Sequence, residues 1–324
     1  MSAAVSQAFP AGFSLIGGVP LKNPDLAASI FFIVVWALLA PIAVWRFSVR
    51  RTRVAVLIRP AIVIGLRVGT FVIRALEADG NYATGLFIAE QILLLVGLLP
   101  FCEPLISLLR YHVRRYWIPA PTDGPKERRT TLNRLLLLLR LALIAAIVLG
   151  SVSGSQSSGA MSDPSKVDSL KRYRYAILGI TLFIAILSPV IATVFSARNG
   201  LPMRPVFFLM SCAACVIIPS VYKLIITIHP VSLISHGAKA GFYVFSCVPE
   251  VVLVVLYFGF DLERMFDINE AVWKDKVEKK MKKGKWAGNY VSKEESEMRE
   301  APSRLPPSME GGVEQGSTES ECSW

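Results

Sequence analysis

Histidine and cysteine are scarce in this chain of 324 residues, which holds three histidines and five cysteines. One C-x-x-C pair occurs, Cys212 and Cys215, and no second pair completes a four-ligand metal site. The pair lies in the apolar run MSCAACVII, where small side chains favour helix packing. We therefore expect no metal ion and no other cofactor.

Other features that enzymes and pumps require are missing too. The sequence has no glycine-rich phosphate loop, which argues against nucleotide-driven pumping. The late apolar stretch FYVFSCVPEVVLVVLYFGF contains no lysine that could hold retinal. The histidines are predicted on opposite sides of a membrane, His112 on one and His229 and His236 on the other, so they cannot share a zinc ion. No catalytic triad can be assembled, and we expect the protein not to be an enzyme.

Charged residues are also few, at 18% of the chain, whereas 53% of the residues are hydrophobic. This balance, with a mean hydropathy of +0.50, is typical of an integral membrane protein. A helix needs about 20 apolar residues to cross a bilayer, and the chain offers seven such stretches. We therefore expect an all-α protein with seven transmembrane helices. The predicted spans are Leu26–Trp45, Val54–Leu76, Tyr82–Leu109, Leu135–Ser151, Tyr175–Ala197, Pro205–Ile228 and Ala238–Leu262.

The distribution of lysine and arginine predicts the orientation. Basic residues are concentrated after the first and third spans, whereas the second connection is acidic and the sixth holds only Lys239. The fourth connection is the exception, because it is also basic (Lys166, Lys171, Arg172 and Arg174). Summed over all connections, the positive-inside rule predicts an external amino terminus and a cytoplasmic carboxyl terminus.

This orientation divides the chain into three parts: an extracellular segment at 1–25, a transmembrane domain at 26–262 and a cytoplasmic tail at 263–324. The tail contains the segment WKDKVEKKMKKGKW (Trp273–Trp286), whose lysines can attract anionic lipids at about 1 kcal/mol per cation. They are Lys274, Lys276, Lys279, Lys280, Lys282, Lys283 and Lys285. The alternative is a topogenic flank that binds nothing specific. From Ser292 to Trp324 the composition predicts disorder.

Ionisable residues inside the predicted spans are unusually numerous. Each charge near the bilayer centre costs roughly 2.5–3.5 kcal/mol on insertion scales, so partners are expected. They are Arg59, Arg67, Arg74, Glu90, Glu103, Arg140, Lys223 and Glu250. Counting depth along the second and third spans predicts the ion pairs Arg67 with Glu90 and Arg59 with Glu103.

Glu250 follows Pro249 inside the last span, where proline frees a backbone carbonyl. Its expected partners are Arg67 or Lys223. These charges predict a polar cavity that binds a lipid headgroup or small amphiphile; the alternative is a set of pairs that only fixes helix packing. Arg140 is expected to extend toward the cytoplasmic surface.

The arrangement resembles the fungal RTA-like lipid-translocating exporter family over roughly residues 25–265. The resemblance is carried by FVIRALE (Phe71–Glu77), by Tyr222 and Lys223 in PSVYKLIITI, and by the aromatic last span that ends in an aspartate. It implies seven helices and transbilayer movement of lipids or lipid-like toxicants, or stress sensing linked to it. The residues to which it points are Arg74, Glu77, Lys223, Glu250 and Asp261.

We therefore predict a membrane transporter or lipid-translocating protein that acts on lipids or amphiphilic toxic compounds and has no nucleic-acid partner. The predicted substrate-binding residues are Arg67, Arg74, Glu77, Glu90, Tyr222, Lys223, Glu250 and Asp261. The alternative is a seven-transmembrane receptor or stress sensor that signals to a G protein or another cytoplasmic partner through its loops and tail. A non-catalytic scaffold is a third possibility. The expected location is the plasma membrane, with other endomembranes as the alternative.

Overall fold

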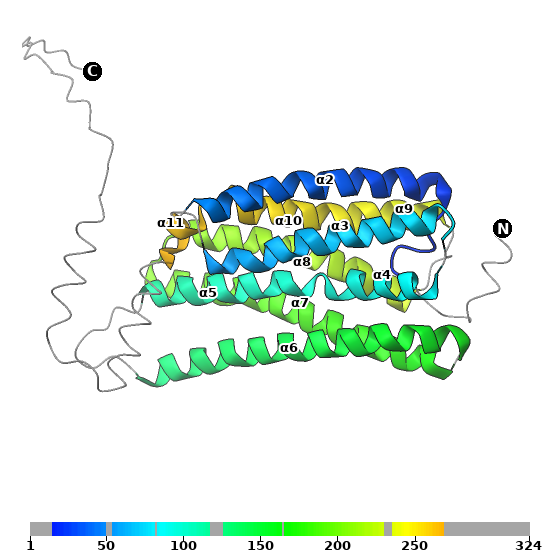
Figure 1. The fold of residues 1–324 in the computed structure, drawn as a ribbon. Helices are drawn as coiled ribbons and strands as arrows, with labels where there is room; N and C mark the ends of the chain where they lie inside the picture. The colour runs from blue at the N-terminus through cyan, green and yellow to red at the C-terminus, as the bar shows by residue number, and fades with distance from the viewer. Residues whose placement is uncertain are drawn as a thin grey trace, which may run out of the picture. The chain divides into compact units, whose positions relative to one another are not determined.

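The computed structural model describes residues 15–49, 54–81, 83–116, 126–163, 165–229 and 235–268. Every regular element in these ranges is helical (Figure 1). The long helices run side by side along one axis, and the shorter ones continue or end them. The elements are α2 (Lys22–Ser48), η1 (Ala55–Leu57), α3 (Ile58–Ala78), α4 (Thr84–Val96), η2 (Leu99–Phe101), α5 (Cys102–Tyr116), α6 (Lys126–Ser162), α7 (Ser165–Asn199), α8 (Arg204–Ile228), α9 (His236–Phe242), η3 (Tyr243–Cys247), α10 (Val248–Gly259) and α11 (Leu262–Phe266).

These elements include seven stretches long and apolar enough to cross a membrane, which confirms the predicted number of spans. They are Asp25–Ser48, Ala55–Ala78, Gly85–Val113, Asn133–Ser157, Ser165–Asn199, Arg204–Ile228 and His236–Gly259. Six begin within about three residues of the prediction. The fifth begins ten residues earlier, at Ser165, so the basic residues assigned to the fourth connection lie in α7 instead. Lysine and arginine are good helix formers, and the helix therefore continues past the apolar stretch.

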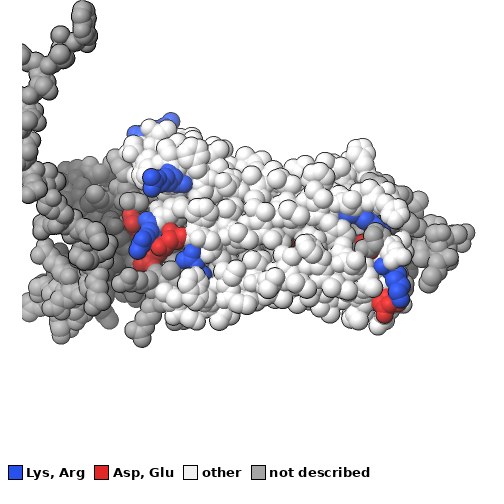
Figure 2. All heavy atoms as spheres, turned by 90° about the horizontal axis from the view of Figure 1, so that it is seen from above, with Lys and Arg blue, Asp and Glu red and all other residues white. Residues whose placement is uncertain are grey.

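Side-chain burial identifies a membrane protein. Large apolar side chains are exposed along the outer helices, for example Phe31 (62%), Leu138 (60%) and Phe207 (61%). In Figure 2 the charged side chains of the visible face gather at the two ends of the bundle, and the broad middle carries none. An apolar belt between charged ends fits a bilayer. The protein is an integral, multi-pass membrane protein.

The third span lies at the centre of the bundle. Its most apolar stretch is 72% buried, against 28% for the first and fourth spans. Its two halves, α4 and α5, contact α3 on one side and α6 on the other, and α5 also contacts α7 and α8. The central position means that any polar group on this span faces protein and not lipid.

Two of the seven spans are discontinuous. The third is interrupted between α4 and α5 by the 3-10 turn η2, which contains Pro100. Proline cannot donate a backbone hydrogen bond, so the α-helical pattern ends at this point. The seventh is interrupted by the π-helical turn η3, directly before Pro249 at the start of α10. Both breaks lie near the middle of their spans.

Parts of the segments on either side of the predicted transmembrane domain pack against the helices. Ile16 is fully buried, and its backbone N–H donates to Gln91 Oε1 of α4 (3.3 Å). At the other end of the bundle α11 contacts α5, where the Phe266 ring meets His112. The lysine-rich segment and the predicted disordered segment lie outside the described residues.

Candidate functional site

Three arginines of α3 lie one above another along the bundle. Arg59, Arg67 and Arg74 are eight and seven residues apart, so their Cα atoms are separated by about 12 Å and about 10 Å along the helix axis. Each forms an ion pair with an acid from a different helix. We call this set the arginine ladder, and its partners define three levels of the site.

The middle level is a buried group of Arg67, Lys223 and Glu250, which we call the central cluster. Arg67 Nε lies 2.6 Å from Glu250 Oε2, and its Nη2 donates to Glu250 Oε1 at 2.8 Å. Lys223 Nζ lies 3.5 Å from the same Oε1. None of the three is more than 2% exposed. Both predicted partners of Glu250, Arg67 and Lys223, are therefore confirmed.

The central cluster lies where the two broken spans meet. Arg67 Nη1 donates to the Leu93 carbonyl (3.2 Å), and Lys223 Nζ donates to the Leu94 carbonyl (2.7 Å). Both carbonyls belong to the last turn of α4, where the helix dipole is negative, and the Leu93 carbonyl also accepts the Gly97 backbone N–H (3.0 Å). Glu250 lies in the first turn of α10, directly after the π-helical turn η3 and Pro249.

A glycine at the break in the third span makes room for this arrangement. A Cβ atom at Gly97 would collide with the Leu93 carbonyl oxygen, and it would lie 3.1 Å from Cζ and from Nη2 of Arg67. That separation is shorter than an ordinary van der Waals contact, so a larger residue would displace the guanidinium group. Gly97 therefore permits Arg67 to reach both α4 and Glu250.

A second level, which we call the end cluster, surrounds Arg74 near the beginning of α2. Arg74 Nη1 donates to Glu90 Oε1 (2.6 Å), and Nη2 donates to the Gly17 carbonyl (2.6 Å) and to Asp25 Oδ1 (3.3 Å). Its Nε donates to the Tyr243 hydroxyl (3.1 Å). The guanidinium group is completely buried, each of its three nitrogens has a charged or polar partner, and its carbon lies 4.7 Å from the centre of the Phe242 ring.

Asp25 and Lys239 complete the end cluster, and neither was among the predicted site residues. The Lys239 ammonium group donates to Asp25 Oδ2, and the Tyr243 hydroxyl donates to Oδ1 (3.1 Å). Asp25 had been assigned to the extracellular segment and Lys239 to the sixth connection, because each stands at the edge of an apolar stretch. The signal that could have identified them was an acid in the first turn of one span together with a base in the first turn of another.

Glu77 also belongs to the end cluster, in the last turn of α3. It is fully buried, and its carboxyl group lies beside that of Glu90. Arg74 is the cation closest to both acids. Three carboxyl groups, those of Asp25, Glu77 and Glu90, thus share two cations.

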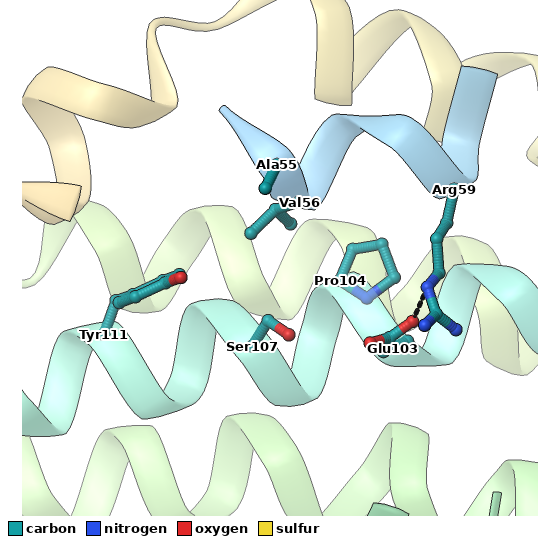
Figure 3. A pocket seen from close by; sticks show the side chains of 7 residues that line it. All are labelled: Ala55, Val56, Arg59, Glu103, Pro104, Ser107 and Tyr111. Atoms are coloured by element: carbon teal, nitrogen blue, oxygen red, sulfur yellow. Dashed lines mark ion pairs between the residues drawn. The ribbon is translucent and has the colours of Figure 1, made fainter. Parts of the chain in front are cut away.

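The third level of the arginine ladder borders a cavity of about 130 Å³ at the opposite end of α3 (Figure 3). Arg59 forms an ion pair with Glu103 of α5, as predicted, and the pair lines one side of the cavity. The Ser107 hydroxyl, on the next turn of α5, accepts a hydrogen bond from Arg140 (3.3 Å). The Arg59 side chain is 49% exposed, so this level is accessible from outside the bundle.

The prediction that Arg67 pairs with Glu90 is wrong. Glu90 pairs with Arg74, one level along the ladder, and Arg67 pairs with Glu250. Depth counted along straight helices cannot decide which of two arginines on the same face of α3 pairs with Glu90. The count also ignores the break in the third span, which changes the depth of residues on either side of it.

Two predicted site residues lie apart from the buried clusters. Tyr222 is one residue from Lys223, but its hydroxyl donates to the Ala238 carbonyl of α9 (3.0 Å). Asp261 caps α11, where its Oδ1 accepts from the Arg264 backbone (3.4 Å). Its carboxylate also pairs with the Arg264 guanidinium (3.3 Å).

Comparisons of the chain with models of known protein families, with curated proteins and with solved structures find no match. The functional argument therefore depends on the residues and on their geometry.

Proposed function

We propose that this protein moves an anionic amphiphile, a lipid or a lipid-like compound, across the membrane, and that the central cluster contacts its headgroup. The observation that supports this most is the meeting of two broken spans at three buried charges, Arg67, Lys223 and Glu250. Discontinuous helices whose ends point at a charged group are typical of transporter substrate sites near the bilayer midplane. Ionisable residues inside membranes commonly mark such pathways.

The charge of the central cluster favours an anionic headgroup. Two cations share the single carboxylate of Glu250, so the ionised cluster has an excess positive charge. Lys223 is bound less closely to Glu250 than Arg67 is. Its shortest contact is with the neutral Leu94 carbonyl, and its nitrogen lies 3.5 Å from Glu250. A phosphate or carboxylate forms a stronger hydrogen bond with an ammonium group than a backbone carbonyl does. An anionic headgroup can therefore replace this carbonyl.

The arginine ladder supports a path for such a headgroup. Arg59 is partly exposed beside the cavity, Arg67 is in the central cluster and Arg74 is in the end cluster. Cations at three depths offer successive partners to one anion while the acyl chains stay in lipid. The resemblance to the RTA-like family favours the same substrate class, and we propose the plasma membrane, an external amino terminus and a role in resistance to lipid-like toxicants.

A transport assay with the purified full-length protein tests this proposal. The protein is reconstituted into vesicles that contain a fluorescent anionic lipid, and the labelled lipid that becomes accessible to an external quencher is followed with time. We expect faster movement than in protein-free vesicles, and faster movement for an anionic than for a zwitterionic headgroup.

Lys223→Met removes the proposed headgroup contact, and Lys22→Met is its matched control at the exposed start of α2. A hydrogen bond to a charged group contributes about 1.5–3 kcal/mol, so we expect lipid movement to fall about tenfold or more in Lys223→Met only. Lys223→Arg keeps the charge and should restore part of the rate. Size-exclusion profiles and thermal unfolding show whether each variant is folded. If the wild-type protein moves no lipid, or if folded Lys223→Met moves it at the wild-type rate, the proposal is wrong.

The receptor alternative predicts a different result. Seven helices also suit a receptor, which would accelerate nucleotide exchange on a G protein and leave lipid in place. A protein that accelerates nucleotide exchange and moves no lipid is a receptor.

A further inference from the structure

Glu77 and Glu90 bring two carboxyl groups together inside the end cluster. Both residues are fully buried, and their side chains are within hydrogen-bonding reach of each other. Three of their four oxygens, both of Glu77 and Oε2 of Glu90, accept no hydrogen bond from any described residue. Buried polar oxygens normally have a donor, so a donor is missing at this point.

The cations around the pair are already engaged. Arg74 donates to Glu90 through Oε1 only, and its other donors go to Gly17, Asp25 and Tyr243. The three carboxyl groups of the end cluster therefore exceed its two cations by one negative charge. An unpaired charge in this setting costs several kcal/mol, so the group neutralises instead.

The other polar neighbours on the surrounding helices already have hydrogen-bond partners. From α9 the Lys239 ammonium group is bound to Asp25 of α2, and from η3 the Tyr243 hydroxyl donates to the same aspartate. On α4 the Gln91 amide exchanges hydrogen bonds with the Ile16 backbone (3.3 and 3.4 Å). Each of these three groups thus has another partner.

We infer that Glu77 and Glu90 form a proton-binding site in which one proton is shared between the two carboxyl groups. The proton turns one carboxyl group into a donor for the other and provides the missing hydrogen bond. It also leaves the end cluster with two negative and two positive charges. This inference does not depend on the proposed transport, because it concerns the charge state of the resting protein.

A proton fits the pair better than a metal ion does. Only two carboxyl groups meet here, and the part of the chain that the structure describes has no group of three metal-ligating side chains close enough to hold an ion. A carboxyl pair at hydrogen-bonding distance needs only one hydrogen atom to satisfy its lone pairs.

Infrared spectroscopy of the purified full-length protein tests the inference directly. A protonated carboxyl group has a C=O stretching band that is separate from the bands of carboxylates and that shifts in D2O. We expect this band at neutral pH in the wild-type protein and its loss in Glu77→Gln and in Glu90→Gln. Glu103→Gln is the matched control, since Glu103 lies in the same span as Glu90 but pairs with Arg59 and should not contribute to the band.

Thermal unfolding as a function of pH provides a second measurement, which needs only folded protein. Raising the pH removes the shared proton and leaves two adjacent carboxylates beside one arginine, so the wild-type melting temperature should fall. In Glu77→Gln the amide is a permanent donor, and this fall should disappear.

Adding sodium chloride in place of choline chloride at constant pH should change neither the band nor the melting temperature. A wild-type protein without the band, a band that survives in both glutamine variants, or a stabilisation by sodium that Glu77→Gln abolishes would each overturn the inference.

Discussion

Arg67 and Arg59 differ in burial although they lie on the same helix and each pairs with a glutamate. The Arg67 side chain is 2% exposed and that of Arg59 is 49% exposed. Removing one partner of a buried ion pair costs about 3–5 kcal/mol, because the other charge remains buried without it. A solvent-accessible pair contributes about 1 kcal/mol or less.

We therefore predict that Arg67→Ala strongly destabilises the protein and that Arg59→Ala does so little. In the first variant Glu250 loses its closest cation and the Leu93 carbonyl loses a donor. Thermal unfolding in detergent and the yield of monodisperse protein measure the difference. Equal melting temperatures for the two variants would show that burial does not determine the strength of these pairs.

Residue pairs were only partly predictable from the sequence. The pairing of Arg59 with Glu103 followed from depth alone, because each stands near the same end of its span. Arg67 and Arg74 share a face of α3, and the choice between them depends on where α4 ends and on where Glu250 enters from a distant part of the chain. Asp25 and Lys239 were missed because a charge at the border of an apolar stretch is normally a solvated flank.

At the scale of the helices, the break between α4 and α5 determines the central cluster. Gly97 stands at this break, and a methyl group there would collide with the Leu93 carbonyl oxygen and press against the Arg67 guanidinium at 3.1 Å. Gly69, on α3, has no atom within 4 Å of the position that a Cβ atom would take.

Gly97→Ala should therefore lower stability by about 1–3 kcal/mol, as expected for overpacking, and should also reduce lipid movement. Gly69→Ala should be neutral or should stabilise its helix by about 0.5–1 kcal/mol. Melting temperatures of the two variants in one detergent test this pair of expectations. If Gly97→Ala is as stable as Gly69→Ala, Arg67 has more freedom at the break than the geometry indicates.

The existence of the spans was predictable from the sequence. The prolines mark where a span could be interrupted, but the sequence does not tell which of them interrupts its helix. Hydropathy identifies every span because hydrocarbon requires about 20 apolar residues. Pro41, Pro100, Pro189 and Pro249 all lie inside spans, where proline favours a kink, yet α2 and α7 continue through theirs. Whether a proline interrupts a helix depends on whether neighbouring side chains can satisfy the freed carbonyls, and only the assembled bundle shows this.

For the whole molecule, the orientation predicted from the basic connections can be measured by thiol labelling. Lys22 and Arg264 are exposed at opposite ends of the bundle, and the four described native cysteines are buried or half-buried. In a Cys322→Ser background, a membrane-impermeant thiol reagent added to intact cells should label Lys22→Cys and leave Arg264→Cys unlabelled. The reverse pattern would show that the amino terminus is cytoplasmic.

The separation of Arg67 from Glu250 along the chain has a consequence for biosynthesis. Their side chains meet across 183 residues, so Arg67 enters the membrane five spans before the helix that neutralises it is made. Three arginines at roughly 2.5–3.5 kcal/mol each make α3 a poor substrate for insertion alone. Glu103 and Glu90 of the third span can pair with Arg59 and Arg74 soon after synthesis. Arg67 has to wait until the seventh span, which carries Glu250, has been made. Until the seventh helix is inserted, Arg67 therefore has to be kept away from lipid, either at the translocation channel or by a membrane chaperone.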